Sequence, residues 1–247
     1  MGATELLLVR HGESLANVAA DAAELAHAEV IGMLVRDPDV PLSRLGAEQA
    51  RALGVWLRDL PSGAAPQSVW CSPYVRARQT AQLAIDGTGL ELLVRLDERL
   101  RDRELGILDL LTTAGVEARM PAEAERRRWL GKFYHRPPGG ESWADLALRV
   151  RSLLVDLDRQ EDGRRVLVVC HDAVIMVLRY ICEGLSEAEV LAIGEASAVR
   201  NASVTRLVRL GGEGGWAVDV FNVDSHLDDV DDVAGPIDAT DPQGGTR

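Results

Sequence analysis

The chain has 247 residues, 47% of them hydrophobic, which is enough to bury the core of one sizeable α/β domain. Its formal net charge of -12 at pH 7 makes nucleic acids and acidic membrane surfaces poor partners for the chain as a whole. It has three cysteines, no run that resembles a secretory leader and none long enough to cross a bilayer, so we expect a cytoplasmic chain with reduced thiols.

Short apolar runs alternate with helix-prone segments along most of the chain. In chain order the pattern predicts strand 4–9, helix 13–30, helix 43–60, strand 68–71, helix 72–85, strand 90–94, helix 122–132, helix 142–159, strand 165–170, helix 174–182, helix 187–193 and strands 202–210 and 216–223. Apart from its one helix, the stretch 97–140 is predicted to be irregular. This alternation predicts a mostly parallel sheet covered by helices on both faces.

Two of the predicted strands end in a histidine, "LLLVRH" at His11 and "VLVVCH" at His171. In sheets of this kind, ligands bind at the carboxyl ends of the strands. We therefore expect the two strands to bring both imidazoles to the same edge of the sheet.

The residues near these histidines suit a phosphate ester. Arg10 and Arg76 each lie close to the end of a strand, and guanidinium groups offer planar, permanently charged donors to phosphate oxygens. Gly12 is expected to let the backbone approach the ligand, and the helix after it to point N–H groups at the anion. His11 can act as a covalent nucleophile if its second ring nitrogen donates to a backbone carbonyl, and nearby guanidinium groups favour its neutral form.

Four segments together resemble a known family. They are "LLLVRHGES" with Asn17 three residues beyond Ser14, "PLSRLGAEQARALG", "CSPYVRARQTA" and the strand that ends in "CH". In this order, and over about residues 4–227, they resemble the histidine phosphatase superfamily, also called the phosphoglycerate mutase-like family.

The resemblance implies a role for each motif residue. His11 is the implied phosphoryl acceptor of a two-step transfer, and His171 is the partner imidazole that stabilises the transferring group. The phosphate-binding residues implied are Arg10, Asn17, Arg76 and His171. The family needs no metal, so we expect no cofactor, and the expected partner is a small-molecule phosphate ester rather than nucleic acid or membrane.

The resemblance also implies the architecture. The family fold is a three-layer α/β sandwich, with a mostly parallel, doubly wound sheet and helices on both faces. We expect one catalytic domain over residues 1–227, with a helical and loop lid inserted at about 107–140. Residues 228–247 are acidic and rich in Gly and Pro, so we expect a disordered tail there. The sequence does not indicate an oligomeric state.

The proton donor is where this sequence departs from the family pattern. The family places Glu four residues before a glycine, and in "LDERLRDRELG" that position is Asp102. Glu104 lies two residues further on, and Asp172 follows His171 as an acid does in the acid phosphatase branch of the family. Our order of preference is Asp102, then Glu104, then Asp172. Whichever residue donates must be protonated near neutral pH, which requires a raised pKa.

Substrate specificity is expected in the lid, the least family-like part of the chain. The segment "WLGKFYHRPPGGES" offers four polar lid residues: Lys132, Tyr134, His135 and Arg136. Glu141, at the end of the same segment, either caps the next helix or orients a pocket arginine.

Four functions remain open on the sequence. We favour a metal-independent phosphomonoesterase that forms a phosphohistidine on His11. A phosphoglycerate mutase-type phosphotransferase is the alternative, although the chain lacks the "TGW" segment that mutases of the family carry. A catalytically weak phosphate-binding protein is compatible with Asp102 in place of Glu. A metal-dependent hydrolase is the least favoured, because no compact ligand motif such as HExxH is present.

Overall fold

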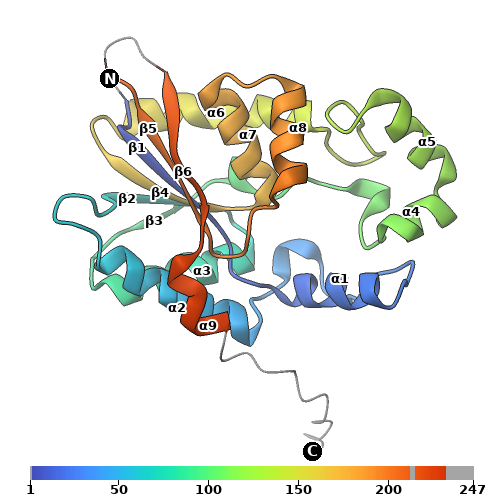
Figure 1. Cartoon of the computed structure of the whole chain (residues 1–247), viewed down its shortest axis with the longest axis horizontal. Helices are drawn as coiled ribbons and strands as arrows, with labels where there is room; N and C mark the ends of the chain where they lie inside the picture. The colour runs from blue at the N-terminus through green and yellow to red at the C-terminus, as the bar shows by residue number, and fades with distance from the viewer. Residues whose placement is uncertain (1, 212–214, 232–247) are drawn as a thin grey trace, which may run out of the picture.

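The computed structural model describes residues 2–211 and 215–231, and in these a six-stranded sheet lies between two layers of helices (Figure 1). The strands are β1 (Glu5–Arg10), β2 (Ser68–Cys71), β3 (Val94–Leu96), β4 (Arg165–Cys170), β5 (Val204–Arg209) and β6 (Trp216–Val223). Their order across the sheet is β3-β2-β4-β1-β5-β6. The pairs β2–β3, β2–β4 and β1–β4 are parallel, whereas β5 and β6 run antiparallel at one edge. The predicted mostly parallel sheet is confirmed.

The helices fall into two layers and a separate group. They are α1 (Leu15–Leu25), α2 (Arg44–Arg58), α3 (Val75–Thr88), α4 (Thr113–Arg119), α5 (Pro121–Leu130), α6 (Trp143–Gln160), α7 (Asp172–Glu183), α8 (Glu187–Ala196) and α9 (Asp228–Asp231). Figure 1 shows α6, α7 and α8 above the sheet, α2 and α3 below it, and α4 and α5 beyond its end.

The core is split by the sheet into two apolar clusters, because successive side chains of a strand point to opposite faces. Leu6 and Leu8 of β1 pack with α6 and α7, whereas Leu7 and Val9 pack with α2 and α3. All four are almost fully buried, and burying a Leu side chain contributes about 1.5–3 kcal/mol. Burial on both faces explains why this strand reads as a continuous apolar run.

The central pair of strands brings the two histidine-bearing loops together. β1 and β4 pair in parallel with Arg10 opposite Cys170, so the residue after each strand leaves the sheet at the same edge. The backbone N–H of His11 extends this pairing by donating to the Cys170 carbonyl at 3.0 Å. The prediction that both histidines meet at one edge of the sheet is confirmed at the level of the backbone.

Three element predictions were wrong. The helix predicted over 13–30 is α1, which ends at Leu25 with Ala26 as its C-cap. The third strand is Val94–Leu96 rather than 90–94, because Val94 is the residue that pairs with Val69 of β2, while Leu93 is 90% exposed. Helix α4 lies where we expected irregular chain. Its sequence, "TAGVEAR", contains Thr and Gly, which weaken helix propensity, but Thr112 caps it by accepting from Gly115 N.

The predicted acidic tail coincides only in part with the described residues. Residues 228–231 form α9, and the rest of the predicted tail lies outside the described residues. Over the described parts of the chain, no helix combines the length and apolar character required to cross a membrane.

Candidate active site

The carboxyl end of the sheet gathers the two predicted histidines and Arg76. His11 follows β1, and His171 follows β4 and begins α7 as its N-cap. Their ring centroids lie 5.1 Å apart. Arg76, in the first turn of α3, donates from Nε to Nε2 of His11 at 3.2 Å. Three segments that are far apart in the sequence therefore meet at the ring of His11.

His11 is held as a neutral imidazole with a fixed orientation. Its Nδ1 lies 2.7 Å from the Gly12 carbonyl and donates to it, which leaves the lone pair on Nε2. The ring is 3% exposed, and burial, reinforced by His171, Arg76 and Arg10, holds its pKa well below the ordinary value. The expected carbonyl partner and the expected effect of the guanidinium groups are both present.

His171 is fully buried between a hydroxyl and a carboxylate. Its Nε2 lies 2.8 Å from Ser72 Oγ, and its Nδ1 lies 3.3 Å from Asp102 Oδ2. With the proton on Nδ1, the Ser72 hydroxyl donates to Nε2 and the N–H faces Asp102. Burial lowers the pKa of His171, and the Asp102 carboxylate only partly offsets this. The ring of Tyr74 packs edge-on against His171 at 5.1 Å.

Arg10 reaches the cavity from the end of β1. Its Nη1 donates to the Val199 carbonyl, and its Nε is buried without a hydrogen-bond partner among the described residues. A buried guanidinium N–H with no acceptor is unfavourable, and an anionic oxygen would satisfy it. This geometry suits the phosphate-binding role that the sequence suggested for Arg10.

Asn17 is engaged in the cap of α1. Its Oδ1 accepts from Ser14 N at 3.0 Å, and its own N–H donates to Ser14 Oγ at 3.2 Å. Asn201 donates from Nδ2 to the same Oδ1 and also to the His11 carbonyl, at 3.3 and 3.0 Å. Asn17 is thus linked to the His11 loop through Asn201, and a contact of Asn17 with phosphate stays a prediction.

The structure bears on two backbone expectations. Packing by itself requires a glycine at position 12, since a Cβ there would lie 2.4 Å from the Gly46 carbonyl on α2, and the approach of this backbone to a ligand stays a prediction. The start of α1 has few N–H groups to offer an anion: Leu15 N donates to Pro41 O, and Asn17 N to Ser14 Oγ. The first turn of α7, which carries Asp172, lines the cavity instead.

The three candidate proton donors occupy different environments. Burial raises the pKa of Asp172, and nearby Arg10 only partly opposes this. Burial also opposes ionisation of Asp102, but proximity to His171 and Arg76 outweighs it and holds the pKa of Asp102 well below its usual range. Glu104 is exposed and accepts from the Tyr74 hydroxyl at 3.2 Å. The raised pKa expected for the preferred donor is therefore found at Asp172 and not at Asp102.

The loop that carries Asp102 is anchored by an arginine and a glutamate. Arg149 of α6 donates to the carbonyls of Arg99, Arg101 and Asp102 at 2.5, 2.9 and 2.9 Å. Both of its remaining contacts, from Nε and Nη2, go to the Glu141 carboxylate at 2.9 Å. Glu141 does not cap α6, because Ser142 and Asp145 do so. The expectation that it orients a pocket arginine is met through its backbone carbonyl, which accepts from Nη1 of the cavity-lining Arg103 at 2.9 Å, while its carboxylate pairs with Arg101 and Arg149.

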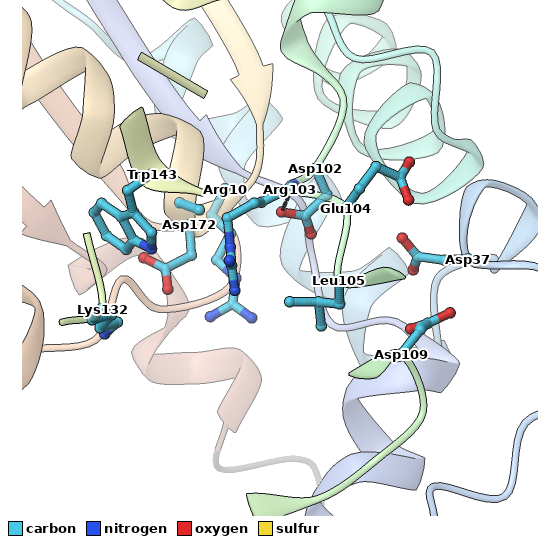
Figure 2. Close-up of a pocket in the computed structure, with 11 residues that line it drawn as sticks. Arg10, Asp37, Asp102, Arg103, Glu104, Leu105, Asp109, Lys132, Trp143 and Asp172 are labelled. Atoms are coloured by element: carbon cyan, nitrogen blue, oxygen red, sulfur yellow. Dashed lines mark hydrogen bonds between the residues drawn. The ribbon is translucent and has the colours of Figure 1, made fainter. Parts of the chain in front are cut away.

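A cavity of about 360 Å³ opens beside this cluster (Figure 2). Of the four lid residues singled out by the sequence, only Lys132 lines it. Tyr134 donates to Glu187, His135 is buried against Glu123, and Arg136 pairs with Asp145. Figure 2 shows Lys132 and Trp143 on one side of the cavity, and Asp37 and Asp109 on the other.

Sequence reasoning missed several residues of the site. Asp37 contacts Arg76, Ser72 contacts His171, and Asp109 lines the cavity. In the sequence, Asp37 lies between two predicted helices and Ser72 at the start of another, and neither position indicates a contact with the site. Over residues 2–211 and 215–231, no group of three or more His, Cys, Asp or Glu is arranged to hold a metal ion.

Comparison with known proteins agrees with this geometry. Residues 6–224 match the histidine phosphatase superfamily (branch 1). A 2,3-bisphosphoglycerate-dependent phosphoglycerate mutase of Methylobacterium radiotolerans is 35% identical over 75% of this chain and 82% of its own, and one of Rhizobium meliloti is 32% identical over 78% and 86%. A mycobacterial glucosyl-3-phosphoglycerate phosphatase, solved with VO3, is 32% identical, with a TM-score of 0.69 over 90% of this chain and 100% of its own.

The fold and the paired histidines at the ends of β1 and β4 define an α/β protein of the phosphoglycerate mutase-like class. Because residues 6–224 match the family, the chain belongs to the histidine phosphatase superfamily, branch 1. Members of that group similar to this chain include both mutases and a phosphatase.

Proposed function

We propose that this chain is a metal-independent phosphomonoesterase that transfers the phosphoryl group of a small ester to His11 and then to water. The observation that carries the proposal is the state of His11, whose Nε2 lone pair is free of a proton because Nδ1 donates to the Gly12 carbonyl. The same Nε2 lies 3.2 Å from the Arg76 guanidinium, which can bind the oxygens of the group under attack.

The proposed reaction has two steps. In the first, His11 Nε2 forms a bond to phosphorus while the ester P–O bond breaks, and an acid gives its proton to the leaving oxygen. In the second, a water oxygen bonds to phosphorus while the N–P bond breaks, and the ionised acid takes the water proton. Inorganic phosphate leaves, and His11 and the acid return to their starting forms.

Asp102 remains our preferred acid, because its Oδ2 lies within 3.3 Å of both Arg76 and His171. It is ionised while these groups face it. A phosphate dianion bound to Arg76 would favour the protonated carboxyl, since like charges at one site raise a pKa. Asp172 is the alternative acid, because burial already raises its pKa and it lines the same cavity.

A mutase is the second candidate, and the 35% identity to a 2,3-bisphosphoglycerate-dependent phosphoglycerate mutase supports it. A mutase must hold substrates that carry two or more anionic groups. The cavity does not favour this, because five of the residues that line it are carboxylates and three are cationic: Asp37, Asp102, Glu104, Asp109 and Asp172 against Arg10, Arg103 and Lys132. The absent "TGW" segment points the same way.

The nucleophile is tested by comparing His11→Asn with His27→Asn, a control at an exposed histidine on the α1–α2 connection. With 4-nitrophenyl phosphate in EDTA, we expect the wild type and His27→Asn to release phosphate and to form an acid-labile phosphoenzyme. His11→Asn should do neither. Wild-type turnover by His11→Asn would refute the assignment, and loss of all activity in EDTA would refute the metal-free reaction.

Phosphatase and mutase are separated by their products. With 3-phosphoglycerate, with and without 2,3-bisphosphoglycerate, we expect release of inorganic phosphate and no 2-phosphoglycerate. Isomerisation without net phosphate release would establish the mutase instead. Phosphate binding without turnover of any ester would identify a binding protein.

A further inference from the structure

Every N–H of Arg76 already has an acceptor in the protein. A guanidinium carries five N–H donors. Nε donates to His11 Nε2, and Nη1 donates to the backbone carbonyl and Oδ1 of Asp37 at 2.7 and 2.8 Å. Nη2 donates to Asp37 Oδ2 at 3.3 Å and to Asp102 Oδ2 at 3.2 Å. A phosphate can therefore bind Arg76 only in exchange for one of these partners.

The two carboxylates also lie between Arg76 and the cavity. Asp37 and Asp102 line the cavity, whereas the side chain of Arg76 is 4% exposed and does not. An ester that enters from the cavity meets these carboxylates before it reaches the guanidinium. The exchange must take place on the path of the substrate to His11.

Asp37 is the partner that is easier to displace. Asp102 is held by two further bonds. Its backbone carbonyl accepts from Arg149, and its carboxylate Oδ1 accepts from Arg103 N at 2.8 Å. Asp37 is the first residue of a short 3-10 helix, Asp37–Asp39. The segment before this helix is open to solvent, since residues 34–36 are all exposed. Among the described residues the Asp37 carboxylate bonds only to Arg76, so no other partner opposes its exchange for a phosphate.

Once displaced, Asp37 remains next to another carboxylate. Figure 2 shows Asp37 and Asp109 on the same side of the cavity, opposite Lys132. Partial burial raises the pKa of Asp109, the hydrogen bond from Leu110 N opposes this, and the charge of Asp37 adds to the rise. Asp109 has no ion pair within the described residues. This side of the cavity is therefore unfavourable for a second anionic group.

We infer that Asp37 is a specificity-determining residue: its carboxylate competes with the substrate phosphate for Arg76 and disfavours esters whose leaving group is anionic. The inference rests on the proposed function and adds a substrate class to it. The preferred substrates are phosphate monoesters whose leaving group is uncharged.

The test compares Asp37→Asn with Asp39→Asn in the full chain. Asp39 lies in the same 3-10 turn, but it pairs with the exposed Arg36 and does not contact Arg76. Titration calorimetry with inorganic phosphate should show about tenfold or more tighter binding by Asp37→Asn, because the competing charge is removed. Asp39→Asn should bind phosphate like the wild type. Weaker or unchanged binding by Asp37→Asn would overturn the inference, because Asp37 would then orient Arg76 rather than compete for it.

The preference for uncharged leaving groups is measured with two matched substrates, glycerol 3-phosphate and 3-phosphoglycerate. Of the two, only 3-phosphoglycerate carries a carboxylate. In Asp37→Asn, kcat/KM for 3-phosphoglycerate should rise by about threefold or more relative to glycerol 3-phosphate. An equal change for both esters would overturn the specificity claim. Failure of the proposed function would appear differently, as no turnover of either ester by any variant, while the phosphate titration would still report on Asp37.

Discussion

Arg149 on α6 donates a 2.9 Å hydrogen bond from Nη2 to the backbone carbonyl of Asp102, although 47 residues separate the two in the chain. The same guanidinium binds the carbonyls of Arg99 and Arg101, and Glu141 holds it in place. Arg149 has no contact with the cavity, so we treat it as a positioning residue that fixes where the Asp102 carboxylate lies.

Arg149→Lys should lower kcat and leave phosphate binding almost unchanged. A lysine cannot bind three carbonyls and a carboxylate at once, so the Asp102 carboxylate would no longer be held in place to act as the acid. We expect a loss of about tenfold to a hundredfold with phenyl phosphate, whose leaving oxygen needs a proton. The loss should be smaller with 4-nitrophenyl phosphate, whose leaving group needs little help. The measurement is kcat and KM for both esters.

Arg159→Lys serves as the matched control, since Arg159 is an exposed residue near the end of the same helix. It should behave like the wild type. An equal loss with both esters, accompanied by a lower Tm, would mean that Arg149 acts only on stability.

The three candidate acids are separated by the same pair of esters. Asp102→Asn should lower kcat for phenyl phosphate by about a hundredfold, within the range typical of general acid catalysis. Glu104→Gln and Asp172→Asn should each lose less than about tenfold, because neither side chain contacts Arg76 or His171. A larger loss in Asp172→Asn would transfer the donor role to the residue whose pKa burial raises.

The parts of this site that could be predicted from sequence are those fixed by single elements. His11 and His171 follow apolar strands, and the rule that parallel strands end at one edge brings them together. Arg76 lies in the first turn of the helix after β2, so the same edge receives it. The apolar pattern of the strands and the start of the helix are visible in the sequence, and each of these residues is positioned by the strand or helix next to it.

The parts that could not be predicted depend on contacts between loops. Asp37 reaches Arg76 across 39 residues, and nothing in "DPDVP" indicates the direction of its carboxylate. Three of the four polar lid residues do not reach the cavity for a related reason. Tyr134 and His135 are polar residues in a family-like segment, but Glu187 and Glu123 bind them away from the cavity. Long-range partners of this kind have no periodic signal in the sequence.

The buried, neutral state of His11 makes a prediction about pH. A histidine of ordinary pKa is mostly protonated at pH 5.5, and about tenfold fewer molecules then carry a free lone pair. Burial and the neighbouring cations hold the pKa of His11 well below the ordinary pKa of histidine, so the nucleophile should remain available as the solution becomes more acidic. The second-order rate constant of phosphoenzyme formation, which reports the free protein, should therefore be nearly constant between pH 7.5 and 5.5.

Rapid-quench measurement with 4-nitrophenyl phosphate isolates this step, because its leaving group depends little on the acid. A fall in rate with a midpoint near 6.5 would show that His11 titrates as an exposed imidazole, contrary to its 3% exposure.

The lowered pKa of His11 also makes the stability of the protein depend on pH. The unfolded chain binds a proton at His11 below pH 6.5 that the folded chain does not, so the free energy of unfolding should fall on acidification. It should fall less steeply in His11→Asn, which removes that group from both states.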